Sequence, residues 1–170
     1  MQTIYLITTG GTIEKAYNEQ AGAVENISNK IAQYLSQLRL PDADVRVIPL
    51  MNKDSLEMSA EDRAGLVRQV QRLLPEHSPI VITHGTDTMV QSGLEIRKAI
   101  PSPEFPIILT GAMAPLGFER SDGLQNLTES LFAARLARPG VYVGMHGQLF
   151  PVERVRKDRE RATFVATETQ

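Results

Sequence analysis

The sequence predicts a single three-layer α/β domain, in which helices cover both faces of a parallel β-sheet. Short apolar segments alternate along the chain with longer segments whose apolar residues recur at helical spacing. Most of the apolar segments stop at polar or glycine-containing turns, as buried parallel strands typically do. The sequence contains no internal repeat, low-complexity tract or linker, so we expect one folding unit.

Length and charge narrow the class of protein. A chain of 170 residues is long enough to bury most of its apolar surface in one domain and too short for two comfortable domains. Its net charge of −2 provides no electrostatic argument for binding nucleic acid or an anionic membrane. We therefore expect neither of these as a partner.

The cysteine count and the N-terminal segment bear on the compartment. The chain has no cysteine, which excludes disulfides, a thiolate nucleophile and a zinc–thiolate site and fits a reducing compartment. Residues 1–11 contain an apolar run but lack a basic region and a small-residue cleavage site. We interpret this run as a buried strand and expect a cytoplasmic protein.

Each element is predicted from its residue pattern. Apolar runs predict five strands, at 3–8, 45–50, 79–83, 106–110 and 140–145. Helical periodicity predicts four helices, at 29–38, 59–74, from 86 or 87 to about 99, and 121–135. The polar segment 14–24 is expected to be a loop, and the charged tail 152–163 has no clear pattern.

Local signals define two of the helix starts. The segment 59–62, Ser-Ala-Glu-Asp, resembles a capping box with aspartate at the last position. Thr86 or Asp87 is a candidate N-cap for the third helix, which Pro101 and Pro103 prevent from continuing.

The turns after the strands predict a site. Polar, glycine-containing or small residues follow four of the strands, at 9–12, 52–55, 84–88 and 111–112. Parallel strands bring their carboxyl ends to one edge of the sheet, where ligands of open α/β sheets bind. We therefore expect a site that several loops assemble together.

Considered one at a time, the candidate site residues indicate structural and not catalytic roles. The segment 9–12, Thr-Gly-Gly-Thr, lacks the motifs of a P-loop or a dinucleotide site, so nucleotide binding is disfavoured. Alone it indicates a tight turn that presents the Thr12 hydroxyl. Thr86 and Asp87 alone indicate a helix cap, and Lys157, among mixed charges, indicates a solvated face.

The histidines do not predict a metal site. The chain has three histidines, at none of the spacings of a metalloprotease: His77, His84 and His146. We interpret His84 as a hydrogen-bonded core residue and expect no metal.

Two long motifs resemble the signatures of the L-asparaginase family, the bacterial asparaginase and glutaminase amidohydrolases. They are TTGGTIE at 8–14 and ITHGTDTM at 82–89. DSLEM at 54–58 and LTGAM at 109–113 are similar to the family's substrate-binding segment and its next strand end. The resemblance implies a flavodoxin- or Rossmann-like domain of the asparaginase N-terminal type. Typical members are about twice as long, so residues 1–170 are expected to be a short form in which the C-terminal domain is absent.

The resemblance implies a catalytic set of Thr12, Tyr17, Thr86, Asp87 and Lys157. Thr12 matches the nucleophile that forms an acyl-enzyme, a task for which a hydroxyl needs activation. Lys157 matches the lysine that activates threonine, and Asp87 matches the aspartate that orients it. A lysine beside a carboxylate normally stays charged, so a basic role requires burial or substrate binding to favour the neutral amine. Tyr17 matches the tyrosine of the family's lid loop.

The same resemblance implies the substrate contacts. Ser55 and Asp87 would bind the α-carboxylate and α-ammonium groups, while Thr12 and Thr86 flank the scissile amide. Gly11 belongs to the same substrate-binding set, and the Ala112 carbonyl would accept from the leaving nitrogen.

The implied function is hydrolysis of L-asparagine to L-aspartate and ammonia without a metal or cofactor. Glutamine is expected to be the poorer substrate, by roughly 1 to 3 kcal/mol for the extra methylene. Alternatives are an amidohydrolase or amidotransferase subunit that acts on another amide such as glutamine, and a non-catalytic module that binds amino acids.

The chain departs from the family pattern in three ways. Lys157 lies near the C-terminus, so we expect its position to depend on a tail that lacks the family's usual continuation. Leu56 replaces a residue that is glutamine or serine in many members, and it cannot hydrogen-bond to a substrate. In full-length relatives a neighbouring subunit's C-terminal domain completes the site. We expect a second copy of this chain, in a homo-oligomer that is a dimer or tetramer, or the chain's own charged tail, to close the pocket instead.

Overall fold

The computed structural model describes residues 1–26 and 30–167. Its centre is a six-stranded sheet in the order β4-β1-β5-β6-β7-β8. The strands are β1 (Gln2–Gly10), β4 (Ala43–Lys53), β5 (Ile80–Thr83), β6 (Pro106–Thr110), β7 (Gly140–Met145) and β8 (Gln148–Pro151). All neighbouring pairs are parallel except β7 with β8. The structure thus confirms the five predicted strands and the α/β class, and it adds β8.

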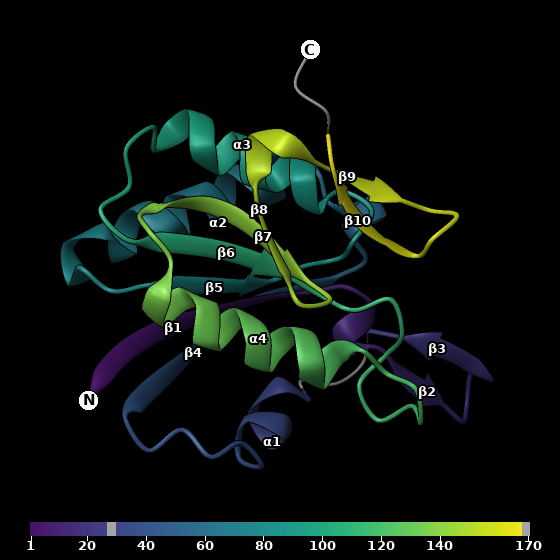
Figure 1. The fold of residues 1–170 in the computed structure, drawn as a ribbon. Helices are drawn as coiled ribbons and strands as arrows, with labels where there is room; N and C mark the ends of the chain where they lie inside the picture. The colour runs from purple at the N-terminus through teal and green to yellow at the C-terminus, as the bar shows by residue number, and fades with distance from the viewer. Residues whose placement is uncertain (27–29, 168–170) are drawn as a thin grey trace.

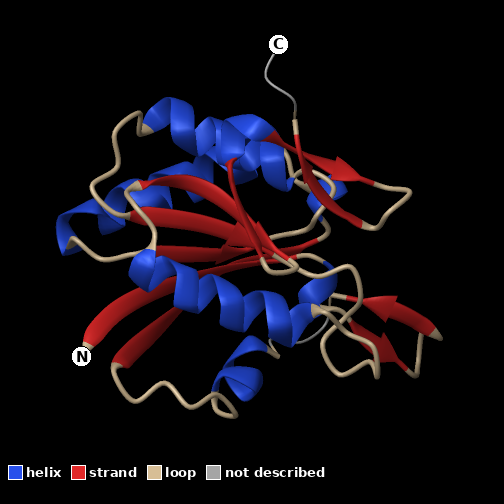
Figure 2. Cartoon of the chain, viewed as in Figure 1, coloured by secondary structure: helices blue, strands red, loops and turns tan. Residues whose placement is uncertain are grey.

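Helices cover both faces of this sheet, as Figures 1 and 2 show. Helices α2 and α3 pack on one face and α4 and α1 on the other. Their bounds are α1 Ile31–Leu35, α2 Ala60–Leu73, α3 Met89–Ala99 and α4 Gly123–Leu136. The described residues also form four short 3-10 helices: η1 (Thr12–Glu14), η2 (Ser55–Glu57), η3 (Leu74–Glu76) and η4 (Val152–Arg154).

The side chains of β1 show why the sheet has two cores. Successive residues of a strand point to opposite faces. Tyr5 and Ile7 pack with α2 and α3, whereas Ile4 and Leu6 pack with α1 and α4. Because both faces are covered, β1 contains an uninterrupted apolar run from Ile4 to Ile7, which is the run seen in the sequence.

In the part of the chain that the structure describes, two antiparallel hairpins lie outside the sheet. One joins β2 (Ala16–Asn18) to β3 (Ala23–Glu25), and the other joins β9 (Val155–Asp158) to β10 (Thr163–Ala166). Both lie toward the carboxyl ends of the parallel strands, on the right of Figure 1. They occupy the segments that the sequence pattern left as a loop and as an unassigned tail.

The helix starts give one confirmation and one correction. Ser59 and Asp62 form the predicted capping box at the start of α2. The prediction that Thr86 or Asp87 caps the third helix is wrong. The chain turns through these residues first, so the N-cap of α3 is Thr88, which makes no side-chain cap bond.

The boundaries of two other helices also differ from the prediction. Helix α1 is shorter than the predicted segment, of which Asn29 lies outside the described residues, and α4 begins at Gly123. Within residues 1–26 and 30–167, no helix is long and apolar enough to cross a membrane.

Candidate active site

Glycines allow the four predicted turns to meet at one edge of the sheet. A methyl group on Gly11 would overlap the backbone of Gly85, and one on Gly111 would overlap the carbonyl oxygen of His84. A methyl group on Gly85 would lie 2.5 Å from the Ser55 hydroxyl. The convergence predicted from the strand order is therefore confirmed, since residues from all four turns are in contact.

Thr12 begins η1 directly after two glycines with positive φ, Gly10 (98°) and Gly11 (78°). Residues with a Cβ rarely adopt this conformation, and here it turns the chain sharply off the end of β1. Thr12 is partly buried and Glu14, on the same short helix, is almost fully buried.

Glu14 helps to hold this turn. Its carboxylate accepts a hydrogen bond from the Gly10 amide at 3.0 Å. Burial raises the pKa of Glu14 to about 7, and the bond from Gly10 opposes part of this rise. The carboxyl group is a titratable neighbour of Thr12 that the sequence pattern did not reveal.

Thr86, Asp87 and Lys157 form a compact cluster. The Lys157 ammonium donates to the Thr86 hydroxyl at 2.7 Å and to the Asp87 carboxylate at 3.0 Å. Lys157 lies on β9 and its side chain is 17% exposed. The structure thus brings together three of the predicted catalytic residues, although Lys157 is distant from the other two in sequence.

A second cation contacts Asp87. Nη2 of Arg159 lies 2.8 Å from Oδ1 of Asp87, the oxygen that also accepts from Lys157. The Arg159 side chain is 70% exposed, so it reaches Asp87 from the solvent side.

Ser55 is buried beneath the same edge, in η2. Its hydroxyl has no hydrogen-bond partner among the residues that the structure describes. Asp54 caps η2 by accepting from the Leu56 amide, and Lys15 pairs with Asp54 at 2.6 Å. The hydrogen bond from Lys15, followed by that from Leu56, holds the pKa of Asp54 below its usual range.

Two further side chains hold the Ser55 backbone. The carbonyl oxygen of Ser55 accepts a hydrogen bond from the Thr88 hydroxyl at 3.0 Å. The buried guanidinium of Arg63 donates to the Met58 carbonyl at 2.7 Å and reaches the Ser55 carbonyl at 3.5 Å. Arg63 lies on the predicted face of α2, but its inward orientation breaks the polar-out rule and was missed.

Tyr17 lies apart from the cluster. It is 58% exposed on β2, and no hydrogen bond among the described residues joins it to Thr12 or Thr86. The end of its hairpin is tied to the site, because Asn26 donates to the Gly11 carbonyl at 2.8 Å. Leu56 is 68% exposed beside Ser55.

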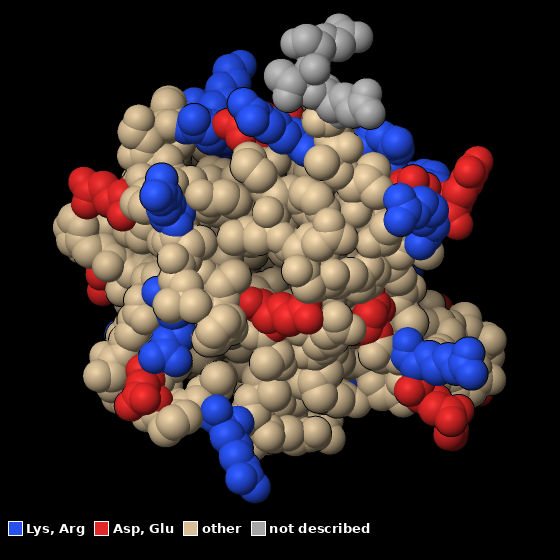
Figure 3. Space-filling view, in the orientation of Figure 1, with Lys and Arg blue, Asp and Glu red and all other residues tan. Residues whose placement is uncertain are grey.

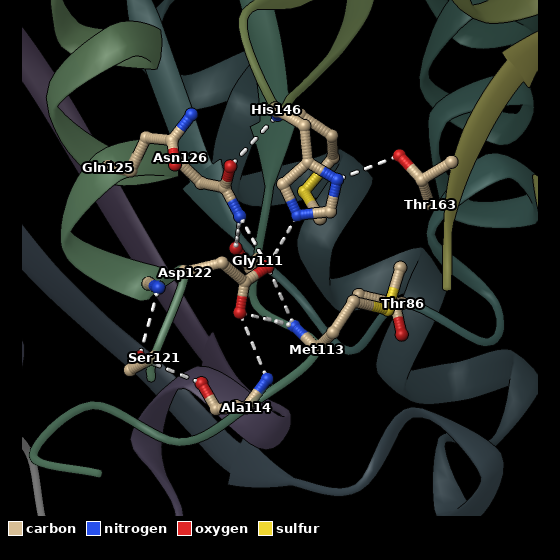
Figure 4. Close-up of polar contacts among 12 residues, drawn as sticks. Thr86, Gly111, Met113, Ala114, Ser121, Asp122, Gln125, Asn126, His146 and Thr163 are labelled. Carbon is tan, nitrogen blue, oxygen red and sulfur yellow. Dashed lines mark hydrogen bonds and ion pairs between the residues drawn. The ribbon is translucent and has the colours of Figure 1, made fainter. Parts of the chain in front are cut away.

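The loop that carries Ala112 is held by Asp122, as Figure 4 shows. The Asp122 carboxylate accepts from the amides of Met113 and Ala114 at 2.9 to 3.0 Å and from the Asn126 side chain at 2.9 Å. Burial disfavours its ionised form, but hydrogen bonds from Met113, Ala114 and His146 outweigh this and lower the Asp122 pKa. Ala112 itself is fully buried.

His146 connects Asp122 to the hairpin that carries Lys157. Its Nε2 lies 2.7 Å from Asp122, and its Nδ1 lies 2.7 Å from the Thr163 hydroxyl on β10 (Figure 4). Because an ionised carboxylate only accepts, Nε2 of His146 is the donor in the hydrogen bond to Asp122. The chain reverses at His146, whose φ is 51°.

The prediction for His84 is confirmed. It is fully buried, with Nδ1 2.8 Å from the Gly85 carbonyl and Nε2 2.8 Å from the Ser92 hydroxyl. Burial lowers its pKa to about 4. No group of three or more potential metal ligands occurs in the part of the chain that the structure describes.

Comparisons with known proteins bear on the family and the fold. Residues 3–168 match the family model of the asparaginase N-terminal domain. An L-asparaginase from Thermococcus kodakarensis is 32% identical over 154 residues, which cover 91% of this chain and 47% of the relative. The structure titled the thermostable L-asparaginase from Thermococcus kodakarensis matches with a TM-score of 0.86 and 30% identity, over 97% of this chain and 51% of that one.

A second kind of relative is also similar. One subunit of the glutamyl-tRNA(Gln) amidotransferase from Archaeoglobus fulgidus is 32% identical over 150 residues, which cover 85% of this chain and 34% of the relative. This chain thus spans about half, or less, of the length of the proteins that it matches. Its fold and the family model covering nearly all of it show that the chain belongs to the asparaginase family, as an N-terminal-type domain.

Proposed function

We propose that the protein is an L-asparagine amidohydrolase that produces L-aspartate and ammonia through an acyl-enzyme on Thr12. The observation that carries this proposal is the hydrogen bond of Lys157 to the Thr86 hydroxyl, with Asp87 on the same ammonium group. A hydroxyl nucleophile requires a neighbouring group that removes its proton, and the proposal is supported by the close approach of Gly11, before Thr12, to Gly85, before Thr86.

The first half of the reaction forms an ester. The Thr12 oxygen attacks the side-chain amide carbon, and the amide carbon–nitrogen bond breaks. The hydroxyl proton passes to the leaving nitrogen, which departs as ammonia. Bound substrate has to favour the neutral amine of Lys157, which then accepts this proton directly or through Thr86 and returns it to the leaving nitrogen.

The second half hydrolyses the ester. A water molecule attacks the same carbonyl carbon, its proton passes to Thr12, and aspartate is released. The group that served as base in the first half serves again here. No metal or cofactor takes part in either half of the proposed reaction.

Substrate recognition uses the loops around this triad. Asp87 binds the α-ammonium group and the buried Ser55 hydroxyl binds the α-carboxylate. Ser55 suits this role because its hydroxyl has no partner among the described residues, and an unpaired buried hydroxyl is costly to leave unsatisfied. Gly11 provides the close backbone approach, and the Ala112 carbonyl accepts from the leaving nitrogen.

An ammonia-release assay tests the proposal. Purified protein is given L-asparagine, L-glutamine and D-asparagine, together with the variants Thr12→Ala and Thr86→Val. Each variant should lower kcat by on the order of 10³ while keeping the wild-type melting temperature. Thr3→Val, at the opposite end of β1, is the matched control. Near-normal turnover by either site variant would remove the assigned role.

The similarity to an amidotransferase subunit supports a second candidate function. Under that alternative the site hydrolyses another amide, such as glutamine, and passes ammonia to a partner. Turnover of glutamine above asparagine would favour it. Binding of L-aspartate without turnover of any amide would instead favour a non-catalytic module.

We also propose that a homo-oligomer, a dimer or tetramer, completes the site. The chain matches only about half the length of its relatives, and its own charged tail already supplies Lys157. Light scattering at the assay concentration tests this, because an active monomer would show that no second copy is needed.

A further inference from the structure

Asp87 is shared between two cations that differ in exposure. Lys157 is mostly buried and also bonds to Thr86, so it is held by two partners. Arg159 is mostly exposed and bonds to Asp87 alone among the ion pairs of the described residues. An ion pair with one solvent-exposed partner is weak, so Arg159 is the exchangeable partner of Asp87.

Arg159 is one of several charged side chains on the β9–β10 hairpin. Lys and Arg side chains lie among Asp and Glu side chains over β9 and β10, on the right of the face seen in Figure 3. Arg159 follows β9 two residues after Lys157, and both side chains converge on one carboxylate oxygen. The hairpin therefore supplies two separate positive groups to the site.

Asp87 and Arg159 together could bind both charged groups of an α-amino acid. In an α-amino acid the ammonium and carboxylate groups are bonded to the same carbon, so the nitrogen and the carboxylate oxygens lie about 3 Å apart. If the ammonium group takes the place of Arg159 on Asp87, the substrate carboxylate lies within reach of the displaced guanidinium. One ion pair is then replaced by two, and the planar guanidinium matches a carboxylate with two parallel hydrogen bonds.

The side chains next to Ser55 in the sequence do not provide a cation that could bind the substrate carboxylate. Leu56 is exposed beside Ser55 and offers no hydrogen bond, so this segment contributes only the Ser55 hydroxyl from its side chains. A single neutral hydroxyl is a weak ligand for a carboxylate compared with a cation.

We propose that Arg159 is a specificity-determining residue that recognises the α-carboxylate of the substrate, and that it leaves Asp87 when the α-ammonium group arrives. The proposal rests on the proposed function, in which Asp87 binds that ammonium group. It predicts that Arg159 favours amides with a carboxylate and disfavours those with an ammonium group alone, because such a cation competes with Arg159 for Asp87.

Three amides separate these contributions. L-Asparagine carries both charged groups, succinamate lacks the ammonium group, and β-alaninamide lacks the carboxylate. Arg159→Gln should raise KM roughly tenfold for asparagine and succinamate, with kcat changed less than twofold. For β-alaninamide the same variant should leave KM unchanged or lower it. Arg159→Lys should raise KM less than Arg159→Gln does, because lysine keeps the positive charge but cannot form the two parallel hydrogen bonds of the guanidinium.

The matched control is Arg161→Gln, which removes the same charge from the exposed turn of the same hairpin. Its KM values should stay within twofold of wild type. An equal penalty of Arg159→Gln on all three amides would mean that Arg159 only positions Asp87 and would overturn the proposal. Unchanged KM values for asparagine and succinamate would overturn it too.

Calorimetric titration with L-aspartate separates this inference from the proposed function. If no amide is hydrolysed, the proposed function fails, but weaker L-aspartate binding by Arg159→Gln still supports carboxylate recognition. Binding equal to that of wild type overturns it. If wild-type protein binds no L-aspartate, both proposals fail.

Discussion

Gly11 and Gly85 lie with their backbones in contact, so the two candidate threonines, Thr12 and Thr86, each follow one partner of the same contact. Neither glycine has room for a side chain, because a methyl group on Gly11 would overlap Gly85 and one on Gly85 would overlap Ser55. This contact leaves no space for a side chain between the turns after β1 and β5.

Replacing Gly11 by alanine should therefore abolish ammonia release and destabilise the fold. The substitution adds both the overlap with Gly85 and the cost of a backbone conformation that glycine alone adopts readily (φ 78°, ψ −176°), about 1 to 3 kcal/mol. Gly22→Ala is the matched control, since Gly22 also has a positive φ (64°) but nothing within 4 Å of an added methyl group. It should be destabilised by its positive φ and keep its activity. Equal activity of the two variants would show that the contact is dispensable.

Glu14 should make the fold less stable as the pH rises. Its pKa is about 7 in the folded protein and 4.5 in the absence of the fold. Between these values the unfolded chain has lost the proton that the folded chain keeps, so stability falls through this window. The full penalty, up to about 3 kcal/mol, is present above pH 7.

Glu14→Gln tests this by urea unfolding between pH 4 and 8. The variant should match wild type near pH 4 and exceed it at pH 8, because the amide oxygen still accepts from Gly10. Glu19→Gln, which alters an exposed carboxylate in the turn between β2 and β3, is the control. With Glu14 replaced, the remaining pH dependence of stability should include that of His84. Its pKa is lowered to about 4 in the folded protein, so the free energy of unfolding should fall as the pH drops below 6.5. A constant difference between variant and wild type at every pH would contradict the assignment.

The elements that were predicted correctly are those whose signal is local. The capping box of Ser59 and Asp62 depends on adjacent residues, and the buried strands each left a run of apolar residues. The two hairpins left no such signal. Their strands are only three or four residues long, and the turn of the second contains Ala162 at φ 47°, a position where glycine is usual.

In the candidate site, too, the residues that lie in recognisable sequence motifs were predicted. Motifs resembling the asparaginase signatures indicated the cluster of Thr86, Asp87 and Lys157, and the hydrogen bonds agree with it. The residues that hold the cluster were not indicated. Asp122 and His146 bond across the fold, and their pairing depends on how α4 packs against the turn between β7 and β8. No spacing along the chain encodes that packing.

Thr163→Val should lower kcat by roughly five- to tenfold while leaving KM nearly unchanged. The substitution keeps the shape but removes the hydroxyl that bonds to His146, a loss of about 1 kcal/mol. Thr163 stands beside Phe164, the residue that pairs with Lys157, so loosening β10 loosens the lysine. Thr163→Ser should restore kcat. A lower melting temperature with unchanged kcat would mean that the buried Phe164 alone positions the hairpin.

Tyr17 and Asn26 should act as one unit, although Tyr17 is exposed. Asn26 ties the end of the β2–β3 hairpin to the Gly11 carbonyl, beside Thr12, and Tyr17 lies on the other strand of that hairpin. If the hairpin closes over bound substrate, its anchor and its tyrosine serve the same closed state. Tyr17→Phe and Asn26→Ala should each lower kcat/KM, by about tenfold and fivefold respectively.

A double-mutant cycle measures this coupling, because residues that act independently have additive effects. The kcat/KM of the double variant should lie no more than about twofold below that of the less active single variant. Asn18→Ala provides the comparison, since Asn18 accepts from the turn amides of Gln20 and Ala21 at the far end of the hairpin. Its effect should be smaller than that of Asn26→Ala, because the Gly11 anchor remains. Fully additive losses for Tyr17 and Asn26 would separate the anchor from the tyrosine and assign Tyr17 a role outside the lid.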